Sequence, residues 1–141
     1  MAFKVATESF EIGSEGEGDM IDITGDVRKA LESSDVSNGI ATVFILGSTA
    51  AVTTIEFEPG LAKDFPRMLD RVAPKNADYD HEKKWHDGNG RSHVKASLVG
   101  PSLTIPVAKG ELVLGEWQQI VVAEFDTRPR TRKVVVQLVG E

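Results

Sequence analysis

The stretch LVLGEWQQIVVAEFDTRPRTRKVVVQLVGE, residues 112–141, indicates the class of fold. It holds two runs rich in β-branched residues, LVLGEWQQIVVAEFD and RKVVVQLVGE, with a short polar segment between them. Such runs are typical of strands joined by tight connections. A further strand, within SLTIPV, precedes them across the turn AKGEL. The sequence therefore predicts three antiparallel strands that form a meander at the C-terminal end.

The run KVVVQLV, residues 133–139, is apolar on both faces of its predicted strand. A strand in a small antiparallel protein usually has one face in water. Apolarity on both faces therefore favours burial between two sheets or at a subunit interface. We expect a symmetric oligomer.

The residues before position 112 show both strand and helix patterns. From residue 74 to 92 there is almost no apolar periodicity, and a structureless run of that length in a compact domain is usually either functional or disordered. The predicted elements are a strand at 3–12, a helix at about 23–33, strands at about 40–46 and 50–57, a second helix within 58–74, and a short turn or helix followed by a strand within 93–107.

Interleaved strands and helices that end in hairpin-linked strands favour an α+β fold with mostly antiparallel sheets over a doubly wound α/β fold. The chain has 141 residues, of which 40% are hydrophobic. This length suits one core, so we predict a single domain over residues 1–141.

Composition excludes several classes of function. The formal net charge of −6 and the pI near 5.1 disfavour nucleic-acid binding, because most of the surface would repel a phosphate backbone. The chain contains no cysteine, so any metal must be held by nitrogen and oxygen ligands. Neither a signal peptide nor a run of ~20 apolar residues is found. We expect a soluble, cytoplasmic protein without membrane or nucleic-acid partners.

Three blocks of the sequence together resemble one family. They are GSTAAVTTIEFEPGLAKDF, WHDGNGRSHVKASLVGPSLTIPV and GEWQQIVVAEFDTRPRTRKVVVQLVGE, and the similarity runs from about residue 39 to 141. The chain resembles the YjbQ-like family, whose members are often called secondary thiamine-phosphate synthases. The resemblance implies a two-sheet sandwich with two flanking helices that assembles as a trimer. It also implies an activity in which a thiazole-phosphate nitrogen displaces pyrophosphate from an activated pyrimidine.

One position departs from the family pattern. Many relatives carry a histidine at the start of the block that here reads Gly47-Ser48-Thr49-Ala50. Any role of that histidine is missing from this chain. The blocks around His81, Asp87, Asn89, His93 and Glu116-Trp117-Gln118 are intact.

All three histidines lie within HEKKWHDGNGRSH, residues 81–93. Imidazole and carboxylate groups bind divalent first-row metals, and a catalytic site needs about three protein ligands. His81 and His93, with a third ligand from His86 or Asp87, meet that requirement. We therefore predict a divalent metal, zinc or magnesium, as cofactor. The simpler alternative is that the histidines form hydrogen bonds or face solvent.

Other polar residues are candidates for catalysis and substrate binding. For proton transfer we consider Glu56, Glu116 and His93, since each type can act as acid or base. For binding a phosphorylated substrate we consider the polar side chains beside glycines or within the apolar strands, namely Ser48, Thr49, Asn89 and Gln118. A simpler alternative is that these residues lie on a solvent face or in an ordinary turn and have no role in the chemistry.

The basic run RPRTRK, residues 128–133, has two interpretations. It is a solvated turn, or Arg128 and Arg130, together with Arg132, hold the diphosphate of a substrate, because a guanidinium group matches phosphate oxygens.

These features favour a metal-assisted enzyme that acts on a small phosphorylated molecule, with thiamine-phosphate synthase as the activity that the resemblance implies. Two alternatives remain open. One is a non-catalytic trimer that binds a metal or ligand, and the other is a metal-dependent hydrolase that activates water at the same site.

Overall fold

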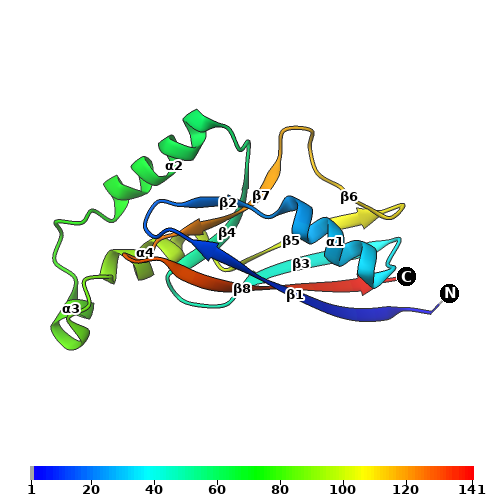
Figure 1. The fold of residues 1–141 in the computed structure, drawn as a ribbon, viewed down its shortest axis with the longest axis horizontal. Coiled ribbons are helices and arrows are strands. Elements are labelled where there is room, and N and C mark those ends of the chain that lie inside the picture. The colour runs from blue at the N-terminus through cyan, green and yellow to red at the C-terminus, as the bar shows by residue number, and fades with distance from the viewer. Residues whose placement is uncertain (1) are drawn as a thin grey trace.

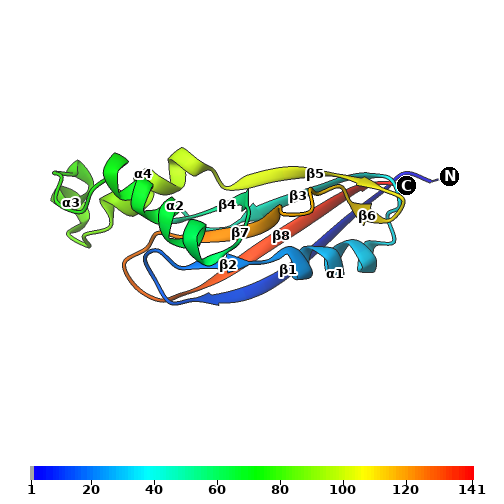
Figure 2. The same cartoon turned by 90° about the horizontal axis from the view of Figure 1, so that it is seen from above.

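The computed structural model describes residues 2–141. It consists of two antiparallel sheets and the helices around them (Figures 1 and 2). The elements in chain order are β1 (Lys4–Ser14), β2 (Met20–Asp22), α1 (Thr24–Ser34), β3 (Gly39–Ile45), β4 (Ala50–Ile55), α2 (Pro59–Val72), α3 (Asp80–Trp85), α4 (Gly90–Val99), β5 (Ser102–Ala108), β6 (Glu111–Leu112), β7 (Gln119–Glu124) and β8 (Arg130–Gly140). The prediction of an α+β fold with antiparallel sheets is confirmed.

Strand pairing differs from the predicted meander. The five-stranded sheet has the order β1-β8-β3-β5-β6, and the three-stranded sheet has the order β2-β7-β4. Consecutive strands β7 and β8 therefore lie in different sheets, although only five residues, 125–129, connect them. The meander was wrong because this short connection crosses from one layer to the other. The strand predicted after residue 111 is also divided, because residues 113–118 form a loop between β6 and β7.

The main core lies between the two sheets. The inner face of the five-stranded sheet packs against α1 and against the inner face of the three-stranded sheet, and the contact consists of valine, isoleucine, leucine and alanine side chains. In α1 the buried Val27, Ala30 and Leu31 lie on one face, as the helical spacing predicts. The helix ends at Asp35, whose φ of 59° places it in the left-handed region.

A second core lies between the outer face of the three-stranded sheet and the helices α2 and α4. Leu69 of α2 and Ala96 of α4 pack there against Val121 and Ala123 of β7. The α2 helix begins after Glu58, whose carboxylate accepts hydrogen bonds from the next free backbone amides.

Residues 2–141 contain four helices, whereas the sequence predicted two helices and a short turn or helix after residue 93. The run from residue 74 to 92, expected to be structureless, contains α3 and the start of α4. Both helices lack an apolar stripe. No residue of α3 is buried, and α4 buries the polar side chains of Arg91, Ser92 and Lys95. Apolar periodicity therefore could not reveal α3 or the first residues of α4.

The outer face of the five-stranded sheet is uncovered in the single chain. Of the apolar run in β8, Val134, Val136 and Leu138 belong to the core, whereas Val135 and Val139 are half-buried on the outer face. Neighbouring apolar side chains on β1 and β3 continue this surface, namely Val5, Ile40 and Phe44. Within residues 2–141, no helix is both long and apolar enough to span a bilayer.

Candidate functional site

The histidine segment lies at the end of the molecule that is remote from the two termini, where α3 meets the start of α4 (Figure 1). Gly90 permits this approach. A Cβ atom at position 90 would lie 2.6 Å from Cβ of Tyr79 and 2.8 Å from Oε1 of Glu82, closer than atoms pack. The backbone amide of Gly90 donates a 2.6 Å hydrogen bond to that same Glu82 oxygen. The lack of a side chain at Gly90 therefore allows the start of α4 to lie against α3.

His81, Asp87 and Asn89 converge within this segment. Nε2 of His81 lies 3.2 Å from Oδ1 of Asp87 and 2.9 Å from the side-chain amide of Asn89. The NH2 group of Asn89 is directed toward Asp87, because carboxylate oxygens accept hydrogen bonds and cannot donate them. Asn89 is buried, so its amide fixes the position of both neighbours.

The third potential metal ligand is Glu82, which was not among the predicted ligands. Ligand atoms of His81, Glu82 and Asp87 all lie within 4.8 Å of one another. His86, in contrast, is outside this group of three. It ends α3 with a φ of 55° and lines the adjacent surface pocket with Tyr79 and Arg91.

His93 lies beside this cluster and joins it to a second space. Its ring centroid is 4.5 Å from that of His81, with the planes tilted by 54°. His93 also lines a small pocket of about 180 Å³ together with Gly47 and Ser48. The structure thus brings the predicted residues Ser48 and His93 together from segments that are 45 positions apart.

A buried arginine holds the loop that carries Asp87 and Asn89. Arg91 donates to both carboxylate oxygens of Glu17, at 2.6 and 2.8 Å, and to the carbonyl of Gly88 at 2.9 Å. The hydrogen bonds between the two side chains lower the pKa of Glu17 and raise that of Arg91. This clamp fixes the loop against the turn between β1 and β2.

A buried polar network lies beneath Gly47, and several of the predicted substrate-binding residues form hydrogen bonds within it. Arg132 of β8 makes a bidentate pair with Glu124 of β7, and Nη2 of Arg132 also donates to Thr49 at 2.7 Å. Thr49 in turn donates to Asp126, which accepts from Arg130 at 2.8 Å.

The network lowers the pKa of one carboxyl group. Burial by itself would raise the pKa of Asp126, but hydrogen bonds from Arg130, Thr127 and Thr49 lower it to about 2. Thr49 and Arg130 are therefore bound within the protein. Arg128, from the same basic run, is exposed.

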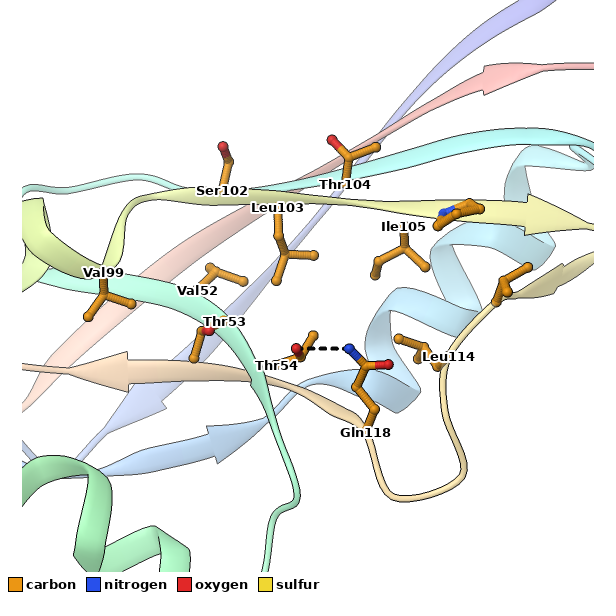
Figure 3. A pocket seen from close by; sticks show the side chains of 12 residues that line it. Val52, Thr53, Thr54, Val99, Ser102, Leu103, Thr104, Ile105, Leu114 and Gln118 are labelled. Atoms are coloured by element: carbon orange, nitrogen blue, oxygen red, sulfur yellow. Dashed lines mark hydrogen bonds between the residues drawn. The ribbon is translucent and has the colours of Figure 1, made fainter.

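The remaining predicted residues lie away from the histidines in the single chain. Glu56 is exposed just beyond the end of β4, whereas Ser48 lies shortly before its start. The length of β4, about six residues at ~3.3 Å each, therefore separates Glu56 from Ser48. Glu116 and Gln118 belong to the loop between β6 and β7. Figure 3 shows Gln118 beside a pocket of about 290 Å³ between β4 and β5, where it donates to Thr54 at 3.0 Å.

Comparison with known proteins identifies the family. Residues 8–141 match the family described as UPF0047 protein YjbQ-like. The chain belongs to the YjbQ-like family. A UPF0047 protein from Methanothermobacter thermautotrophicus is 39% identical over 138 residues, which cover 98% of this chain and 94% of that protein. The UPF0047 protein YugU from Bacillus subtilis is 36% identical, covering 94% of this YjbQ-like chain and 98% of YugU.

Solved structures agree with this assignment. A "YbjQ-like protein of unknown function" from Sulfolobus solfataricus has a TM-score of 0.92 at 30% identity, covering 99% of this chain and all of that one. A YjbQ/UPF0047 family protein from Clostridium acetobutylicum has a TM-score of 0.84 at 40% identity, with coverage of 93% and 98%. The sequence resemblance and the mixed α+β architecture of this YjbQ-like protein are thereby confirmed.

Proposed function

We propose that this YjbQ-like protein binds a divalent metal through His81, Glu82 and Asp87 and acts on a small phosphorylated molecule. The observation that carries the proposal is the convergence of one imidazole and two carboxylates within 4.8 Å. This donor set of one nitrogen and several oxygens suits zinc or magnesium. His86 and His93 then leave the predicted ligand set, and Glu82 enters it.

Several contacts support a preorganised site. Glu82 is fixed by the Gly90 amide, Asp87 by Asn89, and the loop between them by Arg91. Nε2 of His81 faces Oδ1 of Asp87 at 3.2 Å. In the neutral tautomer with its hydrogen on Nδ1, Nε2 is an acceptor, and the two facing acceptors repel each other. A cation or a proton between them removes the repulsion. Orientation of ligands by neighbouring hydrogen bonds is common at metal centres.

The substrate space adjoins this cluster on the His93 side. His93 packs on His81 and lines the pocket with Ser48, so its imidazole can exchange a proton with a bound molecule while Ser48 offers a hydroxyl. A divalent ion at the His81 cluster would supply charge neutralisation for phosphate oxygens. The activity that the family resemblance suggests is thiamine-phosphate synthesis, in which pyrophosphate leaves the pyrimidine as the thiazole nitrogen forms the new bond.

Assembly as a homotrimer is part of this proposal. The uncovered face of the five-stranded sheet presents Ile40 and Phe44, each 43% exposed, beside Val135 and Val139. Contiguous apolar surface of this kind is typical of subunit contacts. Assembly also offers a route by which Glu56, Glu116 and Gln118 of one subunit reach the histidines of another.

Metal titration tests the proposal. Calorimetry with zinc and with magnesium should show binding that His81→Ala and Asp87→Asn abolish, whereas the matched histidine variant His86→Ala binds like the wild type. Absence of metal binding by the wild-type protein, or equal binding by all variants, would contradict the proposal. Turnover is then measured with pyrimidine diphosphate and thiazole phosphate. Metal binding without turnover favours the non-catalytic module, and release of phosphate without joining favours the hydrolase.

A further inference from the structure

The guanidinium group of Arg132 has one nitrogen that the buried network leaves free. Nε and Nη2 face Glu124 and Thr49, and none of the hydrogen bonds among residues 2–141 uses Nη1. Arg132 as a whole is only 6% exposed. A nearly buried arginine with an unused donor nitrogen is unusual, because guanidinium groups normally satisfy all their donors.

Nη1 of Arg132 lies beside Gly47. Among the described residues, the hydroxyl of Ser92 is the one fully buried side-chain polar atom that lacks a hydrogen bond. Nη1 of Arg132 lacks a partner too, so it must retain contact with solvent. The backbone at Gly47, called the outlet below, is next to this nitrogen, because an added Cβ would lie only 2.6 Å from Nη1. Gly47 also has a φ of +115°, a conformation that other residues rarely adopt.

We propose that Nη1 of Arg132, opened to solvent by Gly47, forms a binding subsite for a small oxyanion such as a phosphoryl group. Gly47 lines the pocket that also contains His93 and Ser48. At about 180 Å³ the pocket is large enough for a phosphoryl group. The subsite deepens the proposed function, on which it rests for the identity of the ligand.

Charge and geometry favour an oxyanion at this position. Glu124 occupies the opposite edge of the guanidinium group, so a ligand at Nη1 meets N–H donors without direct contact with that carboxylate. Charge-assisted hydrogen bonds from arginine to phosphate oxygens are among the stronger polar contacts in proteins. Of the basic run, Arg132 is therefore the residue to which the subsite is assigned.

Phosphate titration tests the subsite separately from the metal. Inorganic phosphate is added to ¹⁵N-labelled wild-type protein in the presence of a chelator, and the arginine side-chain resonances are followed. We expect the Arg132 signals to shift with saturation, and the same shift in His81→Ala, which keeps the subsite but removes the proposed metal ligand. Unchanged Arg132 signals at saturating phosphate would overturn the subsite and leave the metal proposal intact.

Two variants and a control complete the test. Gly47→Ala closes the outlet, and Arg132→Lys retains the charge without Nη1, so each should weaken phosphate binding about tenfold or more. The control Arg128→Ala should bind phosphate like the wild type. If Gly47→Ala folds and binds phosphate as tightly as the wild type, or if Arg128→Ala alone abolishes binding, the subsite is not at Gly47. The resonance measurement on the wild type decides the matter even where a variant fails to fold.

Discussion

Arg132 and Glu124 form a buried ion pair that joins the two sheets of the sandwich. Arg132 belongs to the five-stranded sheet and Glu124 to the three-stranded sheet, and their side chains are 7% and 0% exposed. The Glu124 carboxylate also accepts a 2.6 Å hydrogen bond from Ser14 of β1. One carboxylate thus connects β1, β7 and β8.

Replacing Glu124 by glutamine should strongly destabilise the fold. Glu124→Gln leaves the positive charge of Arg132 buried without a counter-charge, and breaking such a pair costs about 3–5 kcal/mol. The free energy of unfolding is measured by denaturant titration. The control is Arg67→Ala, which breaks an exposed ion pair with Asp64 and should cost at most about 1 kcal/mol. Similar losses in the two variants would contradict the role assigned to Glu124.

Acid should destabilise the protein through Asp126. Its pKa is about 2 in the folded protein and 3.8 without the surrounding network, so the unfolded chain takes up the proton first. The stabilisation is complete above about pH 4 and is lost as the pH falls toward about 2, and it amounts to roughly 2 kcal/mol. Unfolding free energies between pH 5 and pH 2 should fall less steeply in Asp126→Asn. Parallel curves for both proteins would exclude Asp126 as the source.

Gly90→Ala should impair metal binding more than stability. The added methyl group meets Tyr79 and the carboxylate of Glu82, so Glu82 must shift from its position in the ligand group. Displacing an oriented ligand typically reduces metal affinity 10–100-fold. The matched control is Gly13→Ala, because a Cβ at position 13 meets no atom within 4 Å. Metal affinity by calorimetry should therefore fall in Gly90→Ala only, and an equal affinity in both variants would remove Glu82 from the ligand set.

Phe44→Glu should dissociate the proposed trimer. A carboxylate on the apolar outer face of the five-stranded sheet would be buried without a partner in any subunit contact made there. Light scattering at several concentrations gives the mass, and Met68→Glu on the exposed side of α2 is the control. A wild-type mass equal to one chain at micromolar concentration would reject the trimer. A trimeric Phe44→Glu would place the contact on another face.

The sequence allowed most strands and the first two helices to be predicted, because their buried faces carry apolar side chains with regular spacing. The three-residue β2 was not predicted, and β6 and β7 were predicted as one strand. The helix α4 was predicted only as a short turn or helix after residue 93, because its buried face carries Arg91, Ser92 and Lys95, whose burial depends on distant partners. Lys95 donates to Asp70, and Arg91 pairs with Glu17, 74 positions away. No local pattern contains such partners, so polar helices of this kind escape periodicity analysis.

Only part of the candidate site was predicted, because some of its contacts also depend on partners that the fold brings together. His81 and Asp87 were chosen because their residue types and their confinement to one segment indicated a metal. Glu82 was missed although it directly follows His81, since glutamate on an exposed helix is common and its contact with Gly90 depends on the fold. The roles of Arg130 and Arg132 could not be separated in the sequence, because partnership with Asp126 or Glu124 is decided by the crossing of β7 and β8 between layers.

The pairing of β1 with β8 has a consequence for how the protein is made. Lys4 lies opposite Gly140 and Phe10 opposite Val134. The first strand therefore cannot pair until β8, more than a hundred residues later in the chain, has been synthesised. One edge of β3 also remains unpaired until β8 is made, because β8 lies between β1 and β3. The edges of both strands therefore stay open during translation, when a chaperone or another nascent chain can pair with them. Folding of the five-stranded sheet is completed only after β8 has left the ribosome, and contacts of such long sequence separation predict slow folding, in the range of milliseconds to seconds.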